Sequence, residues 1–368
     1  MHRRLLVDPR FSTRLRELRA SAGLSLRELG RLVPCSHAHI RDLETGRRQP
    51  SPELAARLDS ALAAGGDLAG LVRAVETPSE FDRLSHVAAR PRLVDAIAVD
   101  ALESMLAEQR RLEDTIGSMP LVEPAQAQLA TVTDLVRDAA DNALRVRLVD
   151  VASQWAQFTA WLCTTTGDLP RGRRLYLRAM EWASEAGNPH MVATALSMRG
   201  HLAWIAGEPR AMVELSRAAQ WPPAAPAVRA LAIQQEARGL AILGDPAVAR
   251  RLDAAEELTH RAAGEDGPPW LYFYDPHFFD AQRGLAMRLL GRHEEAVELL
   301  DGALARLPVE IRSSDWIGWY VLQLAGSYAV VGEREAALAA LADASRIAER
   351  AAAARLRSEV EQLAAGLA

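Results

Sequence analysis

Three amino-acid types are scarce or missing in this sequence of 368 residues. Lysine is absent, cysteine occurs only at Cys35 and Cys163, and asparagine only at Asn142 and Asn188. The absence of lysine makes every strongly basic side chain an arginine, and we infer no function from that. The two cysteines lie in segments of different character and form no paired thiol motif, which indicates a reducing cytoplasm rather than a disulfide-bonded secreted protein.

Long apolar runs are also missing. The opening segment MHRRLLVDPR has only a three-residue apolar run before Asp8, so we expect no secretory signal. The longest uncharged stretch, residues 152–167, contains Gln154, Gln157 and several threonines, which argues against a membrane span. We therefore expect a cytoplasmic protein with no membrane partner.

Catalytic and metal-binding motifs are not found either. There is no phosphate-binding loop, no Gly-x-Ser-x-Gly elbow and no His-Glu-x-x-His helix. His37 and His39 would point to different sides of a helix, and Asp275, which precedes Pro276 in DPHFFD, is better explained as a helix cap than as a ligand. The sequence predicts no enzyme, no cofactor and no metal site.

Helix-forming residues and an uneven charge are what the sequence does contain. Alanine, leucine, arginine and glutamate dominate and β-branched runs are short, which predicts an all-α protein. Residues 1–50 hold eleven arginines and five acidic residues, although the whole chain has a formal charge of −5. The N-terminal segment is therefore basic and the rest of the chain is acidic.

Residues 11–72 contain the stop and start signals of five short helices. Gly23 ends the first apolar stripe, and Ser25 followed by Glu28 is a capping box that begins the second helix. Ser36 can cap a third helix, which Gly46 ends, and Ser51 with Pro52 begins a fourth. A fifth element follows, with Leu68, Leu71 and Val72 on its apolar side.

The stretch LSLRELGRLVPCSHAHIRDLETGRRQPS resembles the helix-turn-helix core of the phage-repressor-like family, also called the xenobiotic-response-element type. The resemblance implies that residues 36–44 form the recognition helix, which lies in the major groove of DNA. It implies base contacts from Ser36, His37, Ala38, His39 and Arg41, and phosphate contacts from Arg47 and Arg48. It also implies a structural pair between Arg19 and Glu44.

Three positions depart from the pattern of that family. Gly30 replaces a favoured alanine, Pro34 replaces the glycine of the turn, and Leu26 stands where a glutamine often contacts DNA. The first two keep the small size or the bend. Leu26 removes one polar contact, which bears on sequence specificity more than on binding itself.

A helical connecting region is expected over residues 76–144. Its main helix lies between breaks at Arg90-Pro91 and Met119-Pro120, and has an apolar stripe with charged residues opposite: Leu93, Ile97, Leu102, Leu106 and Leu112. This amphipathic helix packs either on the domain that follows or in a dimer interface, and both are compatible with the sequence.

A repeated pattern begins after residue 145: an apolar helix, a glycine followed by a charged residue, and an alanine-rich helix. The turn glycines are Gly167, Gly207, Gly244, Gly291 and Gly332. One copy, RGLAMRLLGRHEEAVELLDGALARLP, resembles a tetratricopeptide repeat, in which Gly284 permits close contact of the helices and Pro308 ends the second one. Five hairpins and a last helix over residues 351–365 would build an α-solenoid over residues 145–368, after an N-terminal domain of residues 1–75.

The first helices of such a solenoid line its concave face. The repeat register predicts that this face carries aromatic rings, amides and arginines: Gln157, Phe158, Trp161, Met198, His201, Trp204, Gln234, Gln235, Arg238, Phe278, Gln282, Arg288, Trp319 and Gln323. Such a composition suits an organic ligand, although aromatic residues at helical spacing also serve simply as core.

The segment PPWLYFYDPHFF, residues 268–279, joins the third hairpin to the fourth. The register places Phe278 toward the groove and Phe279 toward the neighbouring helix as packing. The loop aromatics before Pro276 form either a lid or a packed plug, and the stiffness of Pro268 and Pro269 favours the plug.

Together these features resemble bacterial regulators that join a helix-turn-helix domain to a tetratricopeptide-like sensor. The resemblance implies a homodimeric transcription regulator that binds a double-stranded DNA operator and whose solenoid binds a signal. Family members often hold peptides through asparagines, which are scarce here. The glutamines Gln157, Gln234, Gln235, Gln282 and Gln323 could substitute for them, but the aromatic residues favour a small hydrophobic metabolite over a peptide. The alternative is a protein–protein adaptor with weak or accessory DNA binding.

Overall fold

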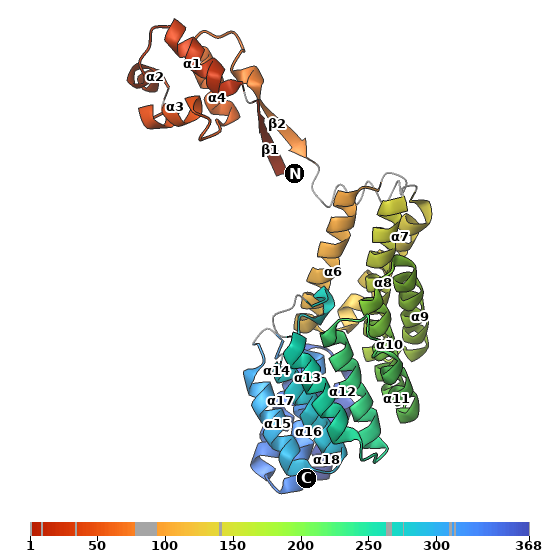
Figure 1. Ribbon diagram of the computed structural model, residues 1–368. Coiled ribbons are helices and arrows are strands. Elements are labelled where there is room, and N and C mark those ends of the chain that lie inside the picture. Colours follow the sequence, from red (N-terminus) through yellow and green to blue (C-terminus); the bar gives the residue numbers. More distant parts are fainter. Residues whose placement is uncertain are drawn as a thin grey trace. The chain divides into compact units, whose positions relative to one another are not determined.

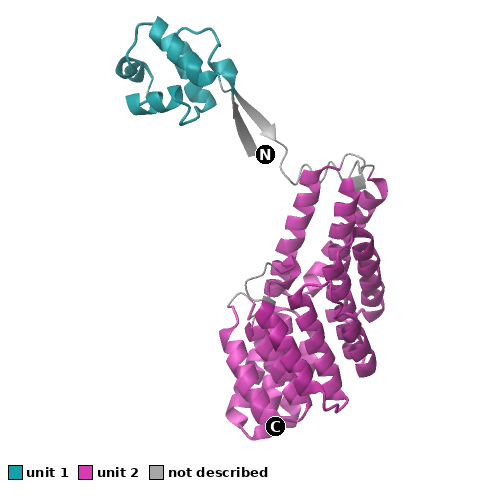
Figure 2. Cartoon of the chain, viewed as in Figure 1, with its two compact units in different colours: residues 1–86 teal, residues 87–368 magenta. Residues whose placement is uncertain are grey.

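The computed structural model describes residues 2–8, 10–33, 35–77, 94–139, 142–262, 267–274, 276–308, 311–312 and 314–367. The chain forms two compact units, residues 1–86 and residues 87–368 (Figure 2). The all-α class is confirmed, with one short pair of strands added to it in the first unit.

Unit 1 is built from four short helices, one 3-10 turn and two strands: α1 (Phe11–Ser21), α2 (Leu26–Leu32), α3 (His37–Glu44), α4 (Pro52–Ala61), η1 (Ala69–Leu71), β1 (His2–Val7) and β2 (Val72–Thr77) (Figure 1). The predicted fifth helix is thus a single 3-10 turn. The chain continues from it as β2, which pairs antiparallel with β1 in a register that sets Val7 opposite Val72.

The predicted helix starts of unit 1 are present. Ser25 Oγ accepts from the Glu28 backbone N–H at 3.2 Å, and the Glu28 carboxylate accepts from the Ser25 backbone N–H at 2.7 Å, which together form the capping box. Ser36 caps α3 through the His39 N–H, and Ser51 caps α4 through the Leu54 N–H. These caps satisfy amides that a helix leaves unpaired, so the short helices are delimited locally.

The core of unit 1 is a single apolar cluster contributed by all four helices. Its buried members are Phe11, Leu15, Leu29, Val33, Ile40, Leu43, Ala55, Leu58, Leu68 and Val72. Leu26 is partly buried and packs on the edge of this cluster. The core fixes which side of α3 faces outward.

Unit 2 contains the solenoid and two helices that precede it. Its helices are α6 (Ala96–Ile116), α7 (Val122–Asp138), α8 (Asn142–Thr165), α9 (Leu169–Ala186), α10 (Pro189–Ile205), α11 (Pro209–Ala218), α12 (Pro226–Ile242), α13 (Val248–Ala262), α14 (Pro276–Leu289), α15 (His293–Arg306), α16 (Asp315–Val331), α17 (Arg334–Arg350) and α18 (Ala354–Leu367). Two 3-10 turns, η3 (Met119–Leu121) and η4 (Pro269–Leu271), lie among them.

The five helical hairpins are α8–α9, α10–α11, α12–α13, α14–α15 and α16–α17, as the turn glycines predict (Figure 1). Each of those glycines has a positive φ: Gly167, Gly207, Gly244, Gly291 and Gly332. Side chains other than glycine rarely adopt this conformation, so these positions set the hairpin spacing. The last helix begins three residues later than predicted, because α17 extends to Arg350.

The first helices of successive hairpins contact one another in the order α8, α10, α12, α14 and α16. Close approach within a hairpin needs small residues, as at Gly284, where a Cβ would lie 2.8 Å from Leu300 Cγ. This arrangement forms an inner row of five helices, from which side chains of consecutive hairpins reach a common space.

The helix α6 packs on this solenoid with only part of the predicted stripe, of which Leu102 and Leu106 are buried. Ile97 and Leu112 of the predicted stripe are exposed, at 51% and 44%, and Leu93 lies outside the described residues. The buried side instead ends in charged residues: Arg110, Glu113 and Asp114. The partners of these charges come from distant parts of the chain, as described below. A role of this helix in a dimer stays a prediction, as do the domain boundaries at residues 75 and 144.

Candidate functional site

The third helix of unit 1 has an exposed N-terminal side. The predicted DNA-contacting residues Ser36, His37, Ala38, Arg41, Arg47 and Arg48 are exposed, and His39 is half-buried. Its inner side is held by Ile40 and Leu43, which are fully buried. Arg48 lies beside this helix, with Nη1 3.3 Å from His39 Nδ1 and Nε 3.9 Å from Asp42 Oδ2.

The predicted pair between α1 and α3 is present. Arg19 Nε donates to Glu44 Oε1 at 2.5 Å, and Arg19 Nη2 donates to Oε2 at 2.9 Å. Arg16 adds a hydrogen bond to the Glu44 backbone oxygen at 2.7 Å. Because the Glu44 side chain is buried, the two-pronged arginine satisfies a charge that would otherwise be costly, and it fixes α3 against α1.

A cavity of about 300 Å³ lies in unit 2. Ten aromatic side chains line it, from α8, α10, η4 and the residues after it, α14 and α16: Phe158, Trp161, Trp204, Trp270, Tyr272, Phe273, Phe278, Trp316, Trp319 and Tyr320. Its volume is at the low end of the range for small-molecule sites, which typically combine apolar walls with a few polar groups.

Eleven of the fourteen predicted groove residues line this cavity: Gln157, Phe158, Trp161, Met198, His201, Trp204, Gln235, Arg238, Phe278, Gln282 and Trp319. They come from the first helices of all five hairpins. That any of them contacts a ligand stays a prediction.

The other three predicted residues do not line the cavity and have partners within the protein. Gln234 donates to the Phe279 backbone oxygen at 3.1 Å and accepts from the Tyr274 hydroxyl at 2.9 Å. Arg288 Nε donates to Gln323 Oε1 at 2.9 Å, so these two residues satisfy each other. The helical register was correct only to within one position for these side chains.

An aromatic row crosses the cavity wall between three hairpins. The ring centroids of Trp161 and His201 lie 5.6 Å apart, those of His201 and Trp204 lie 5.2 Å apart, and those of Trp204 and Trp319 lie 4.9 Å apart. Such tilted and edge-on contacts stabilise the rings without covering their remaining faces. The row is a rigid apolar surface.

Arg238 is the most deeply buried cation of the cavity, with 2% of its surface exposed. Its guanidinium carbon lies 4.5 Å from the centroid of the Trp204 ring, and its Nη2 lies 3.0 Å from His201 Nδ1. Burial, with the nearby charges of Arg238 and Arg355, lowers the pKa of His201 well below its usual range, so His201 is neutral and can accept this hydrogen bond. Among the described residues no carboxylate forms an ion pair with Arg238, and its Nε has no hydrogen-bond partner.

Arg110 of α6 is a second buried cation in the wall, at 7% exposure. Burial lowers the pKa of its guanidinium to about 10, which leaves it charged at neutral pH. Its carbon lies 6.0 Å from the centroid of Trp270, and no partner for its Nη2 occurs in the described part of the chain. The sequence interpretation missed Arg110, although it follows Leu102 and Leu106 at the same helical spacing, which was an available signal.

Three acidic side chains meet at one end of the cavity: Glu113, Asp114 and Asp315. Glu113 Oε1 accepts from Ser118 Oγ at 2.6 Å and from Trp161 Nε1 at 3.1 Å. Asp114 accepts from the Tyr272 hydroxyl at 2.5 Å and from Trp316 Nε1 at 3.0 Å. Burial raises the pKa of all three, and for Glu113 the nearby Asp315 raises it further, so this cluster carries less than its formal negative charge.

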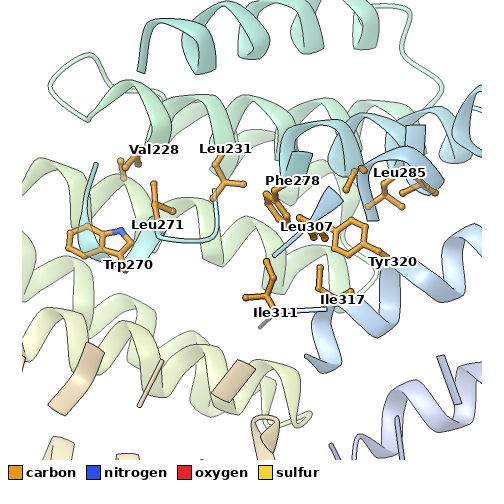
Figure 3. Packing of buried hydrophobic residues seen from close by; sticks show 14 of the residues in the cluster. Val228, Leu231, Trp270, Leu271, Phe278, Leu285, Leu307, Ile311, Ile317 and Tyr320 are labelled. Carbon is orange, nitrogen blue, oxygen red and sulfur yellow. The ribbon is translucent and has the colours of Figure 1, made fainter. Parts of the chain in front are cut away.

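The aromatic loop before α14 is packed into unit 2. Trp270 and Leu271 are buried in the same apolar cluster as Val228, Phe278 and Tyr320, whose side chains Figure 3 shows together. Trp270 Nε1 also donates to Thr194 Oγ1 at 3.0 Å. The loop is thus a wall of the cavity, and Phe278 stands in the same wall rather than apart from it.

The second phenylalanine of this segment behaves as expected. Phe279 packs against Ala230, Ile233, Ala255 and Leu258 of α12 and α13, so its predicted packing role is confirmed. α14 begins at Pro276 as predicted, whereas the capping residue Asp275 lies outside the described residues.

The described ranges contain no metal-binding cluster and no membrane-spanning helix. No group of three or more His, Cys, Asp or Glu side chains there has an arrangement that could hold a metal ion. None of the helices found there is long and apolar enough to cross a bilayer.

Comparisons with known proteins identify the first unit. Residues 10–71 match the family described as a helix-turn-helix domain, a range that covers α1 to α4 and η1. No curated protein matches the chain. The crystal structure of Bacillus thuringiensis PlcR in complex with the peptide PapR7 and DNA is similar over 95% of this chain and 98% of that chain, with 12% identity and a TM-score of 0.37. That likeness is too low to assign a residue or a function to this chain.

Proposed function

We propose that this chain is a homodimeric, DNA-binding transcription regulator, located in the cytoplasm, whose second unit binds a small, largely apolar molecule that modulates DNA binding. The observation that carries the proposal is the pairing of a helix-turn-helix domain with a separate helical unit that encloses an aromatic cavity of about 300 Å³. No catalytic step is part of the proposal.

The DNA-binding half is supported by the surface of α3. The exposed residues Ser36, His37, Ala38 and Arg41 are those that a recognition helix would present to base edges, with His39 beside them. Arg47 and Arg48 follow the helix and would contact phosphates, which fix register without reading sequence. The Arg19–Glu44 pair would keep this surface in a fixed orientation on the domain.

The ligand-binding half is supported by the composition of the cavity. Rings from several hairpins supply apolar area, while Gln235 and Gln282 each have a buried amide oxygen with no partner in the described residues. Unsatisfied buried polar groups are uncommon in native proteins, and a bound molecule would satisfy those beside the cavity. The volume suits a metabolite better than an extended peptide, which agrees with the presence of only two asparagines in the chain.

Regulation would follow from the thermodynamic linkage between ligand binding and the arrangement of unit 2. A ligand that binds one arrangement of unit 2 more tightly than another shifts the population toward that arrangement. In a dimer, such a shift would change the distance between two recognition helices, which must match the spacing of two operator half-sites.

DNA binding is tested by titrating the full chain against the DNA upstream of its own gene at several salt concentrations. We expect specific binding whose logarithm falls linearly with the logarithm of salt concentration. Arg41→Ala should reduce discrimination between bases, whereas Arg47→Ala should weaken binding to all sequences and lower the salt slope by about one. Arg137→Ala, an exposed residue of unit 2, is the control. Absence of a footprint at any salt concentration would instead favour the adaptor hypothesis.

Ligand binding is tested by thermal-shift screening of fractionated cell extracts, because a ligand of the native state raises the melting temperature. Met198→Trp would fill the cavity and should abolish the shift, whereas Leu177→Trp, an exposed position outside the cavity, should not. A shift that survives Met198→Trp would place the ligand elsewhere. A bound ligand that leaves DNA affinity unchanged would refute regulation.

A further inference from the structure

We propose that the ligand of the unit 2 cavity carries a carboxylate, which binds Arg238 at the aromatic row while an apolar ring system fills the rest of the cavity. This inference rests on the proposed function, because it names the chemical class of the molecule that the cavity takes. It assigns to Arg238 the role of ligand counter-ion.

Arg238 is a buried cation without an anionic partner in the described residues. Its side chain is 2% exposed, yet its hydrogen-bonded neighbour, His201, is neutral. The Trp204 face contributes a cation–π contact, which compensates a buried charge only in part. A guanidinium withdrawn from water is costly unless an anion pairs with it, and the described residues supply none.

A comparison within the same unit shows what a satisfied buried charge looks like. Glu236 lies two residues before Arg238 on α12 and is also 2% exposed. It is paired with Arg217 at 2.8 Å and Arg251 at 2.7 Å, and also accepts from Gln220 at 2.6 Å. The buried charge of Glu236, which does not line the cavity, is thus neutralised by two arginines. The buried charge of Arg238, which lines the cavity, has no counter-ion in the described residues.

The charged side chains that line the cavity also bear on the charge of its ligand. Arg110 is also buried and unpaired in the described structure, whereas the hydrogen-bonding needs of Glu113 and Asp114 are met by Ser118, Trp161, Tyr272 and Trp316. Burial shifts these carboxyls toward their neutral form, but arginine stays charged. Three arginines and three acids line the cavity, and Asp315 Oδ1 also lacks a partner in the described residues, but Arg110 and Arg238 are the buried groups that keep a full charge without an ion pair, which favours an anion over a cation.

The planar guanidinium and the aromatic wall favour a carboxylate over other anions. The Nη2 of Arg238 contacts His201 and its buried Nε has no partner in the described residues, and a planar guanidinium is the group that matches the two oxygens of one carboxylate. The surrounding wall is mostly rings, so a single charge on an apolar body fits it better than a doubly charged phosphate. The free amide oxygens of Gln235 and Gln282 would accept hydrogen bonds from N–H or O–H groups on that body.

The test uses the full chain and three probes with one scaffold: 1-naphthylacetate, its neutral amide 1-naphthylacetamide, and the cation 1-naphthylmethylammonium. Isothermal titration calorimetry at pH 7 gives the three dissociation constants. We expect the carboxylate to bind about 10- to 100-fold more tightly than the amide, the range for a hydrogen-bonded charge, and the amine to bind most weakly.

Two arginine variants then test whether Arg238 causes the tighter binding of the carboxylate. Arg238→Gln should reduce carboxylate affinity to the level of the amide and leave amide affinity unchanged. Arg288→Gln is the control, because Arg288 is a half-buried arginine of the same unit that does not line the cavity, and it should keep the full preference. Circular dichroism checks that both variants are folded.

Four results would overturn the proposal. Equal binding of the carboxylate and the amide, a tighter amine, no binding of the carboxylate, or a preference that persists in Arg238→Gln would each refute it. The wild-type comparison needs no variant, so a variant that fails to fold does not remove the test. Binding of the amide alone would refute the anion site but keep a ligand-binding cavity, whereas carboxylate binding without an effect on DNA affinity would refute only the proposed regulation.

Discussion

The hydroxyl of Tyr272 donates a hydrogen bond to Asp114 Oδ2 at 2.5 Å, and so joins the aromatic loop to a helix that lies 158 residues earlier in the sequence. Asp114 also accepts from Trp316 Nε1, which brings α16 to the same carboxyl. Three segments that are far apart in the chain are therefore held at one point on the cavity wall.

This junction gives a prediction for Tyr272→Phe. The change removes one partly buried hydrogen bond to Asp114, and we expect a loss of about 1 kcal/mol in the free energy of unfolding, measured with urea. Asp114→Asn keeps an oxygen that can accept from Trp316 Nε1, sets an amide N–H against the Tyr272 hydroxyl, which can accept, and removes a charge that burial disfavours, so it should cost less than Tyr272→Phe. Equal stability of Tyr272→Phe and the wild type would show that the hydrogen bond contributes nothing.

Glu113 predicts a dependence of stability on pH. Burial and the neighbouring Asp315 raise its pKa from 4.5 to about 8 in the folded protein. A carboxyl with a raised folded pKa stabilises the fold fully below its unfolded pKa, and this contribution is lost as the pH rises through about 8. We expect the free energy of unfolding to fall by on the order of 2 kcal/mol between pH 6 and pH 9.

The matched variant for this prediction is Glu113→Gln, which keeps the acceptor for Ser118 and Trp161 but does not titrate. Its free energy of unfolding should change much less over the same pH interval. If the variant and the wild type lose stability in parallel, then Glu113 is not the group responsible.

Gly30→Ala should destabilise the helix-turn-helix domain. A Cβ at this position would lie 2.8 Å from the backbone oxygen of Cys35, so the turn before α3 would have to move. We expect a cost of about 1–3 kcal/mol and weaker DNA binding, followed by hydrogen exchange of unit 1 in the full chain. Gly70→Ala is the control in the same unit, because a Cβ there meets no atom within 4 Å. Similar exchange in the two variants would disprove the steric argument.

Arg19→Met should be strongly destabilising to unit 1, because it leaves the Glu44 carboxylate buried without its two-pronged partner. Arg16 approaches that carboxylate only to 4.0 Å, so we expect a loss of about 2–3 kcal/mol. Adding Glu44→Gln removes the stranded charge and should restore part of this loss. A double variant that is less stable than Arg19→Met alone would contradict this account.

Some features could be predicted because the sequence determines them locally. The glycines with positive φ, such as Gly207 and Gly291, mark hairpin turns whatever the rest of the chain does, and the Ser25–Glu28 capping box lies within four residues. The spacing of aromatic and polar residues along the first helices then placed Trp161, Trp204 and Arg238 in one wall.

Other features could not be predicted because they depend on distant partners. Glu113 and Asp114 look like solvent-facing charges on an amphipathic helix until Trp161, Tyr272 and Trp316 are brought next to them. Arg288 and Gln323 look like groove residues but bond to each other, since a rotation of one position along the helix decides between cavity and packing. The strands β1 and β2 pair segments about seventy residues apart, which no local pattern indicated.

The position of α6 has a consequence for the specificity of the solenoid. Its C-terminal half already lies against the inner row of helices, through Arg110, Glu113 and Asp114. It belongs to the same chain, so its local concentration at that surface is of millimolar order or higher, whereas a free peptide must compete from dilute solution. An extended partner that used this part of the inner row would therefore first have to displace the contacts of Glu113 with Trp161 and of Asp114 with Trp316.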